Sequence, residues 1–437
     1  MQTFGDATPS VRFTRWGGRP IITNRKTGMM MAEPDETTDA PQWQLTMWTM
    51  VAVQVIMTLS FTFLSPVMPL FLPHLGVTTE AEIDIWSGAL SAITSFIAAL
   101  AAPMWGRMSD RYGRKIMVLR SAFAIGVITI VMALAQNVWH MLGLRILMGA
   151  GAGFSAASVV LIASQVPPAR LGYALGMLST GQLVGSLIGP LLGGILVDVT
   201  GSYRLPFVIG GSLSLVAFVM CWWLVPERFV KPTSEKPKVK LHIAFRAMTQ
   251  MPGMAALVLV LMFTQFAVQA IQPVISLHVQ ELLGHSGNIA SLAGFAFSAT
   301  GLAGVVAVPM LGRLADRIGE REVLLISLFG AALLTLPQAF TESYNWFVAE
   351  RFGVGLFIGA IVPTANALIG RLTNQAERGF IFGMTSSVYF LGNSLGPMSG
   401  GLVAAGFGLH WVFLMTAILL GGTWALVFSA VPGSRPH

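Results

Sequence analysis

The sequence contains few charged residues. Asp, Glu, Lys and Arg make up 10% of its 437 residues, whereas 54% are hydrophobic and the mean hydropathy is +0.71. A water-soluble domain carries roughly 25% charged residues. The composition therefore excludes an ordinary soluble protein and predicts a chain that lies mainly in lipid.

Other absences narrow the function. The single cysteine, Cys221, excludes an intramolecular disulfide. No phosphate-binding loop of the form GxxxxGK[ST] occurs, which argues against ATP as an energy source. The seven histidines are scattered without the spacing of metal ligands, and no break between the apolar runs is long enough for a catalytic domain. We therefore expect neither an enzyme nor a bound metal or other cofactor.

What the sequence does have is long apolar runs. From about residue 46, twelve runs of roughly 20 residues follow one another, and this is the length that crosses a hydrocarbon core. Unpaired backbone is too costly in lipid, and the runs lack the alternation of a barrel strand, so they must be helices. We expect an all-α membrane protein. The predicted spans are near residues 46–71, 85–105, 116–136, 139–164, 172–196, 205–225, 252–279, 288–310, 322–341, 345–369, 379–404 and 409–431.

Charged residues between the spans predict the orientation. Basic residues gather after spans 2, 4, 8 and 10 and in the central linker, whereas the alternate breaks hold Arg204 and several acidic residues. Because Lys and Arg favour cytoplasmic loops, both termini and the linker are expected in the cytoplasm. The net charge of +7 is thus a topology signal. A nucleic-acid partner would need an interleaved basic and aromatic surface, which is absent.

The polar ends and the linker divide the chain. The run Met29 to Met31 offers an internal start, so we expect residues 1–28 to be dispensable. The predicted parts are a disordered N-terminal tail (1–45), a first six-helix bundle (46–225), a linker (226–251), a second six-helix bundle (252–431) and a C-terminal tail (432–437).

An internal repeat relates the two bundles. The charged turn GRMSDRYGRK at residues 106–115 returns as GRLADRIGER at residues 312–321, an offset of 206. The same offset relates RILMGAGAG at residues 145–153 to RFGVGLFIG at residues 351–359, and the glycines of spans 5 and 11 match at an offset of 207. Parallel repeats of this kind usually form a transporter whose substrate site lies between the halves near the bilayer midplane.

Three of these motifs carry a resemblance to a known family. The turn at residues 106–115, Arg145 with Gly149, and the glycine pattern at residues 185–194 resemble signatures of the major facilitator superfamily. Within it the chain is similar to the twelve-span drug:proton antiporters, most of all to the MdtG-like multidrug exporters, over residues 46–431. The resemblance implies the major facilitator fold of two pseudo-symmetric six-helix bundles. It also implies a monomer in the bacterial inner membrane that exports lipophilic or amphipathic compounds in exchange for protons by alternating access. The alternative is a metabolite or lipid facilitator, or a flippase, without tight proton coupling.

The charged turn is predicted to latch the two halves on the cytoplasmic side. Its glycines would let the backbone reverse, and Asp110 can accept hydrogen bonds at a helix start or pair with a neighbouring arginine. The alternative is a solvated loop with no gating role. In the second copy Glu320 replaces Arg114, so that copy is expected to be the weaker latch. The residues assigned to gating are Gly106, Arg107, Asp110, Arg111, Gly113, Arg114, Lys115, Gly312, Asp316, Arg317 and Gly319.

Arg145 is predicted to lie about 9 Å inside span 4, at 1.5 Å per residue. A charge there costs on the order of 2.5–3.5 kcal/mol, so it should face the bundle interior and have a partner. The family resemblance associates this arginine with proton coupling, and Asp84 and Glu281 are the predicted partners. The alternative is a structural arginine bonded to backbone carbonyls. None of the 19 acidic residues lies near the middle of a span, so the proton carrier stays open.

Span 5 carries a face of small residues. Glycines recur every four residues, which allows close helix packing, and a proline bends the helix. The resemblance adds that this seam favours exporters by closing a leak path. The seam residues are Gly185, Gly189, Pro190, Gly193 and Gly194.

Polar residues deep in apolar spans predict the substrate cavity. Buried amides require partners, so each is either glue between helices or a substrate contact. With Phe61, Phe63, Phe263 and Phe266 they predict a large, neutral, aromatic-lined cavity suited to amphipathic organic molecules. The polar members are Gln54, Gln182, Gln265, Gln269, Gln272, Asn366, Tyr389 and Asn393.

Overall fold

The computed structural model of the chain divides into two compact units, Met1–Leu45 and Thr46–His437. The residues that it describes are 11–16, 19–24, 30–31, 40–167, 170–226, 253–284, 288–373 and 378–431. The predicted linker lies almost wholly outside these residues, and the predicted C-terminal tail lies outside them entirely. Within residues 1–28, only the strand residues are described.

The first unit contains a small antiparallel sheet. Strands β1 (Val11–Trp16), β2 (Arg19–Asn24) and β3 (Met30–Met31) lie in the order β1-β2-β3, and Trp16 is paired with Arg19. Two glycines separate β1 from β2 in the sequence, as in a tight hairpin, and both strands contain β-branched residues. These strands lie within the residues for which the composition predicts a disordered tail.

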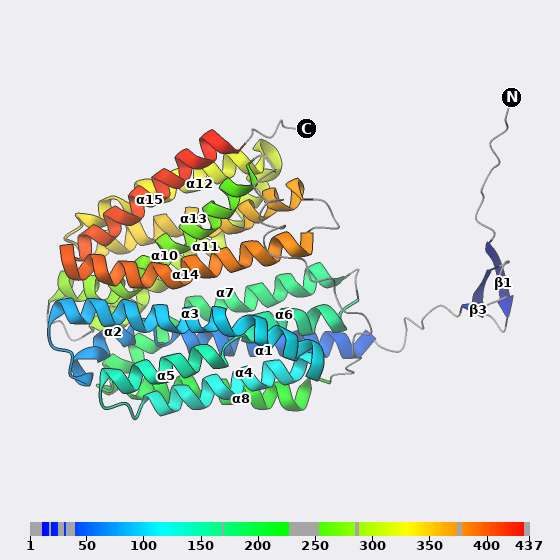
Figure 1. Ribbon diagram of the computed structural model, residues 1–437, viewed down its shortest axis with the longest axis horizontal. Coiled ribbons are helices and arrows are strands. Elements are labelled where there is room, and N and C mark those ends of the chain that lie inside the picture. Colours follow the sequence, from blue (N-terminus) through cyan, green and yellow to red (C-terminus); the bar gives the residue numbers. More distant parts are fainter. Residues whose placement is uncertain are drawn as a thin grey trace. The chain divides into compact units, whose positions relative to one another are not determined.

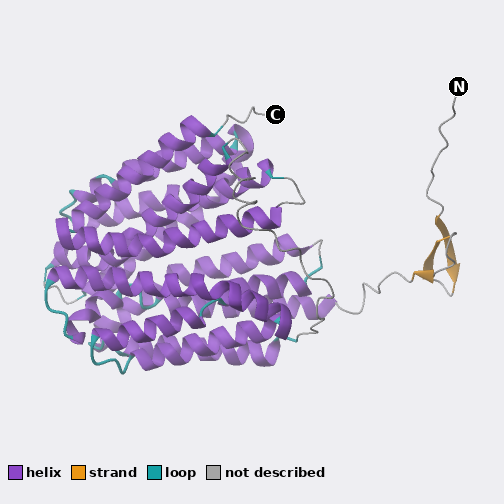
Figure 2. Ribbon diagram, viewed as in Figure 1, coloured by secondary structure: helices purple, strands orange, loops and turns teal. Residues whose placement is uncertain are grey.

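The second unit is built of helices (Figure 2). Eleven described segments are long and apolar enough to cross a membrane, and α14, with 30 residues, is the twelfth long helix. The all-α prediction is confirmed for the bundle. The first half contains α1 (Ala40–Thr62), α2 (Val67–Phe71), η1 (Leu72–Leu75), α3 (Glu80–Tyr112), α4 (Arg114–Met132), α5 (Val138–Gly151), α6 (Phe154–Gln165), α7 (Leu171–Thr200) and α8 (Leu205–Leu224). The second half contains α10 (Met254–Leu283), α11 (Ile289–Ile318), α12 (Glu320–Thr335), η3 (Pro337–Ala339), α13 (Tyr344–Leu372), α14 (Arg378–Phe407) and α15 (Leu409–Ala430).

The halves meet along two pairs of helices. α3 packs along α14, and α7 packs along α11, so these four helices form the boundary between the two halves (Figure 1). We call the end of the bundle with the α3–α4 and α11–α12 turns the turn end, and the opposite end the seam end. Exposed tryptophans mark both ends: Trp222 and Trp223 lie at the turn end, and Trp139 and Trp346 lie at the seam end. Such aromatic belts are typical of the two interfaces of a bilayer.

Span 4 of the first half is broken, unlike its counterpart α13. α5 ends before Gly153, whose φ of +114° is the left-handed value that favours glycine, and α6 follows. The freed carbonyls find donors: Trp105 Nε1 donates to the Ala150 oxygen at 2.7 Å, and Arg120 Nη2 donates to the Ala152 oxygen at 2.8 Å. The Arg120 guanidinium also lies over the Trp105 ring at 3.3 Å. Side chains therefore satisfy the backbone that the break leaves unpaired, as lipid requires.

Candidate functional site

Each charged turn reverses at a single glycine. Gly113 (φ +105°) joins α3 to α4, and Gly319 (φ +96°) joins α11 to α12. The prediction that Gly106 takes part in the reversal is wrong, because Gly106 lies inside α3, as Gly312 lies inside α11. The helices extend beyond their apolar runs because charged side chains at a membrane surface do not end a helix. The reversal itself therefore needs one residue in each half.

Basic residues just after the turns bind the ends of the last helices. Lys115 Nζ donates to the Trp222 oxygen at 2.8 Å, at the end of α8. Arg321, the residue at the same place in the second half, donates from Nε to the Val431 oxygen at 2.7 Å and from Nη2 to the Phe428 oxygen at 2.9 Å. Cations stabilise the carbonyl end of a helix. Lys115 therefore has a structural role within its own half, whatever it does in gating.

The remaining turn residues lie mostly at the surface. Arg107, Arg111, Asp316 and Arg317 are exposed, and Arg114 is the first residue of α4. The side chain of Asp110 lies outside the described part of the chain.

The departure in the second copy also has a local partner. Glu320 Oε1 pairs with Arg371 Nη2 at 2.5 Å, and the Glu320 side chain is 9% exposed. This ion pair joins the start of α12 to the end of α13, both in the second half. Glu320 is thus engaged within its own half and not with the first half.

The seam glycines of spans 5 and 11 pack against the first helix of their own half. A Cβ at Gly185, Gly189 or Gly193 would overlap atoms of α1 or of the turn that follows it. The matching glycines of α14 meet α10 in the same way: Gly392, Gly396 and Gly400. The close approach that four-residue spacing predicts is therefore present in both halves.

A second row of glycines brings the two halves together. A Cβ at Gly194 would overlap the Ala290 oxygen of α11, and a Cβ at Gly401 would overlap the Asp84 oxygen of α3. Gly294 lies equally close to the oxygen of Pro190. These backbone contacts all lie toward the seam end, so that end of the interface is closed.

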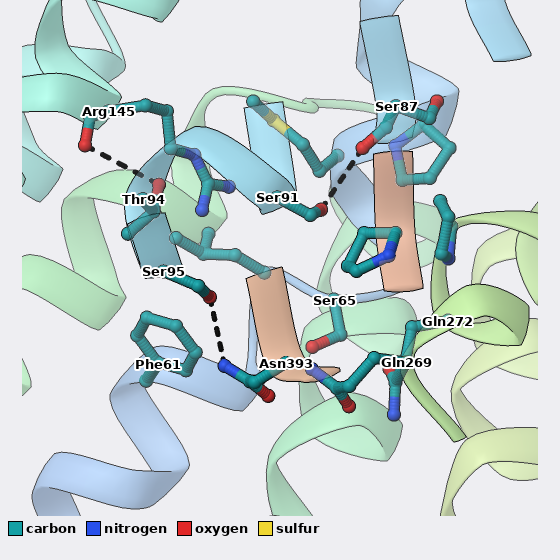
Figure 3. A pocket seen from close by; sticks show the side chains of 15 residues that line it. Phe61, Ser65, Ser87, Ser91, Thr94, Ser95, Arg145, Gln269, Gln272 and Asn393 are labelled. Atoms are coloured by element: carbon teal, nitrogen blue, oxygen red, sulfur yellow. Dashed lines mark hydrogen bonds between the residues drawn. The ribbon is translucent and has the colours of Figure 1, made fainter. Parts of the chain in front are cut away.

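A cavity of about 190 Å³ lies between the halves on the turn-end side of these contacts (Figure 3). Its wall takes side chains from α1, α2, α3 and α5 of the first half and from α10 and α14 of the second. The lining residues are Phe61, Leu64, Ser65, Met68, Pro69, Ser87, Ser91, Thr94, Ser95, Arg145, Gln269, Gln272, Pro273, Asn393 and Pro397.

Arg145 is the one charged residue in this lining. It is 7% exposed, and its Nε is buried without a hydrogen-bond partner. Its backbone oxygen accepts a hydrogen bond from Thr94 Oγ1 at 3.4 Å, and Figure 3 shows the guanidinium extending toward Ser91. An isolated charge in lipid is costly. Water or a polar group of a ligand in the cavity would therefore stabilise this guanidinium.

The predicted partners of Arg145 lie elsewhere. Among the described residues, neither Asp84 nor Glu281 forms an ion pair with it; Asp84 belongs to the first turns of α3, and Glu281 contacts His278 Nδ1 at 3.3 Å. Both acids lie toward the seam end, because α3 begins there and α10 ends there. Their placement follows from helix direction.

Asn393 connects three helices in the cavity wall. Its Nδ2 donates to Ser95 Oγ of the opposite half at 2.9 Å, and its Oδ1 accepts from Gln265 Nε2 at 2.9 Å. Gln265, which is not among the lining residues, therefore orients the amide of Asn393. Asn393 itself contacts both the cavity and the other half.

Comparison with known proteins agrees with this two-half architecture. The family profile described as Major Facilitator Superfamily matches residues 50–288 and 257–437. The chain belongs to the major facilitator superfamily. Proteins of this superfamily are multi-pass membrane transporters and not enzymes, as the sequence predicts for this chain.

Relatives of this facilitator include the multidrug resistance protein MdtG of Escherichia fergusonii, 36% identical over 387 residues, which are 89% of this chain and 94% of the relative. MdtG of Yersinia enterocolitica is 37% identical over 362 residues, 83% of this chain and 87% of the relative. Among solved structures, a D-xylose–proton symporter matches with a TM-score of 0.71 at 15% identity, covering 89% of this chain and 99% of that one. A bacterial homologue of the lysosomal transporter Spinster, in an inward-facing and occupied conformation, matches at 0.69 and 17%, covering 89% and 96%. These structures show the shared fold alone.

The facilitator's cavity differs from the one predicted. Gln269, Gln272 and Asn393 line it, and Phe61 is its one aromatic residue. This cavity is small and polar and contains one cation, so in this conformation it differs from the large, neutral, aromatic-lined cavity that the sequence predicts. The remaining predicted residues are absent from its lining: Gln54, whose Nε2 donates to Thr58 Oγ1 at 3.2 Å, the exposed Gln182, Gln265, Asn366 and Tyr389.

The hydroxyl residues of α3 were missed by the sequence reading. Ser87, Ser91 and Ser95 recur every four residues and so share one face of the helix, next to Thr94. That spacing was a usable signal. Serine in a membrane helix often bonds its own backbone, as Ser91 Oγ does to the Ser87 oxygen at 3.0 Å. A serine alone is therefore a weak sign of a binding site.

Proposed function

We propose that this transporter is a secondary exporter of lipophilic or amphipathic compounds. It works by alternating access and exchanges its substrate for protons. The observation that carries the proposal is the cavity, which takes its wall from both halves and is closed by backbone contacts at the seam end. Sites between two repeated halves are typical of secondary transporters. The relatives named multidrug resistance proteins support export and the substrate class.

The chemistry of the cavity suits mixed substrates. Amides and hydroxyls offer donors and acceptors, whereas Phe61, Leu64 and Met68 offer apolar contact. Its volume of about 190 Å³ is below the roughly 300–1,000 Å³ of sites for drug-sized ligands. The halves must therefore separate to admit such a compound, as alternating access requires.

The proposed orientation places the turn end in the cytoplasm. The basic residues of the two turns support it through the positive-inside bias. Both termini then lie in the cytoplasm, the membrane is a bacterial inner membrane, and the protein acts as a monomer. The conformation, closed at its seam end, is then closed to the outside.

Proton coupling is proposed to involve Asp84, Glu281 and Arg145. Asp84 is 9% exposed beside Gly401, so its surroundings change when the seam end opens. Glu281, on α10, is close enough to Asp84 for the two carboxylates to interact electrostatically. Arg145 lines the cavity that the substrate is proposed to enter, so substrate binding and protonation can affect the same side chain.

The alternative is facilitated transport of a metabolite or lipid without tight proton coupling. One observation favours it: no carboxylate is among the residues that line the cavity in the described structure. Purified protein in liposomes, with a fluorescent lipophilic dye and an internal pH indicator, separates the two. Antiport predicts proton movement that depends on the dye and dye transport that responds to an imposed pH gradient. Dye transport at the same rate with and without the gradient would favour the alternative.

The latch role of the first turn gives a separate test. We expect Asp110→Asn to reduce dye export at least about tenfold, the scale of losing a hydrogen bond to a charged group, while the protein stays folded in the membrane. The matched control is Asp316→Asn in the weaker copy, for which a smaller loss is expected. Wild-type export by Asp110→Asn would contradict the latch.

A further inference from the structure

The two equivalent helices α3 and α11 begin differently. α3 stabilises its own N-terminus: Thr79 Oγ1 accepts a hydrogen bond from the Glu82 N–H at 3.3 Å, and the first turn carries two acidic residues. α11 has neither device. The side chain of its N-cap residue, Asn288, makes no capping bond, and no acidic residue lies in its first turn.

The missing cap comes from the other half of the protein. Asp198, in the last turn of α7, accepts a hydrogen bond at Oδ2 from the Ser291 N–H in the first turn of α11, at 2.7 Å. A carboxylate at this position satisfies a free backbone donor and opposes the positive end of the helix dipole. This stabilisation of the α11 N-terminus is therefore lost when α7 moves away from it.

The contact lies on the closed side of the interface. Gly194, one turn before Asp198, packs against the Ala290 backbone, and farther along the same helix pair Ser298 Oγ donates to the Leu187 oxygen at 2.5 Å. Among the α7–α11 hydrogen bonds of the described residues, the one that Asp198 makes thus lies nearest the seam end. Any separation of the halves at that end removes its partner.

In the described part of the chain, the other seam has no such bond. By the offset of 207 between spans 5 and 11, the counterpart of Asp198 on α14 is Ala405, which has no side-chain acceptor for the start of α3. The self-capped start of α3 needs none. The acidic device therefore belongs to one of the two seams, and its presence is matched to the uncapped helix opposite.

We propose that Asp198 is the lock of the seam end: its carboxylate holds the halves together by capping α11, and the bond must break each time that end opens. Asp198 is a positioning residue that acts on the conformational equilibrium and not on the substrate. The proposal rests on alternating access in the proposed function, but on no particular substrate and on no proton coupling.

Distances between spin labels test the lock directly. Leu134 and Phe340 are suitable sites, because they are related by the repeat, lie toward the seam end in opposite halves, and are 71% and 69% exposed. Both are changed to cysteine for labelling in a Cys221→Ser background, and pulsed electron paramagnetic resonance gives the distance distribution in liposomes. We expect Asp198→Ala to raise the population of longer distances about five- to tenfold, the effect of losing a charged helix cap.

Two further variants make the result specific. Asp198→Asn keeps a side-chain oxygen but loses the charge, so it should give a smaller rise. Glu82→Gln removes an exposed carboxylate from the start of α3, within one half, and should leave the distribution unchanged. Distributions for Asp198→Ala and Asp198→Asn that equal the wild type overturn the lock, as does an equal rise for Glu82→Gln. If Asp198→Ala fails to fold, as judged by size-exclusion chromatography, Asp198→Asn decides. No substrate is needed, so a failed lock is distinguishable from a failed export assay.

Discussion

Replacing Arg145 by methionine is expected to reduce export by about 10- to 100-fold, because hydrogen bonds to charged groups contribute about 1.5–3 kcal/mol and each 1.4 kcal/mol is tenfold. Arg145 is the one charged donor in the cavity lining, and its Nε has no protein partner. The folded protein should be at least as stable as the wild type, since a buried charge without a counter-ion is replaced by an apolar side chain of similar length. Dye export from liposomes and thermal unfolding in detergent measure the two effects.

The repeat supplies a matched control for this variant. Arg351 is 6% exposed, its Nε also lacks a partner, and its backbone oxygen accepts from Thr300 Oγ1 at 3.2 Å, just as that of Arg145 accepts from Thr94. Arg351 does not line the cavity. Arg351→Met should therefore cost much less export than Arg145→Met. Equal losses would mean that burial, and not the cavity, explains the requirement for arginine.

Gly194→Val is expected to abolish export by preventing the seam end from closing. A Cβ at this position would overlap the backbone of Ala290 in the opposite half, where no flexible side chain can move aside. Overpacking costs about 1–3 kcal/mol or more, which disfavours the closed conformation by about 10- to 100-fold. The labels at Leu134 and Phe340 should report longer distances, and the same sample should fail to export dye.

The same helix provides the control. Gly176 also belongs to α7, but no atom of the described residues lies within 4 Å of the place where its Cβ would be. Gly176→Val should therefore keep most of its export and the wild-type distances. If Gly194→Val exports as well as Gly176→Val, the backbone contact between α7 and α11 does not close the protein.

Much of the fold could be predicted because lipid restricts the choices. Long apolar runs must be helices, and glycines at four-residue spacing must face a close neighbour, as Gly185 and Gly189 do. The spacing does not reveal which neighbour. Gly193 packs within its half and Gly194 packs across the interface, although the two are adjacent in the sequence.

The site was harder to predict because it depends on how two halves lie together. The prediction that Asp84 pairs with Arg145 rested on charge and on the place of Asp84 near the end of its span, whereas Arg145 lies beside Thr94 in the cavity wall. The role of Asp198 could not be predicted, because its partner is a backbone N–H 93 residues away and a backbone group carries no sequence signal. The four-residue spacing of the α3 serines is visible in the sequence. It does not predict a cavity, because a serine hydroxyl can instead bond to the backbone of its own helix.

The break between α5 and α6 makes the two halves mechanically unequal. In the second half, α13 is one continuous rod of 29 residues, whereas in the first half the equivalent span has a joint at Gly153 held by Trp105 and Arg120. A continuous helix transmits force along its length, but a joint lets one segment turn while the other stays still. The first half can therefore bend at Gly153, next to the cavity wall that Arg145 forms, whereas the helix of the equivalent span in the second half is unbroken.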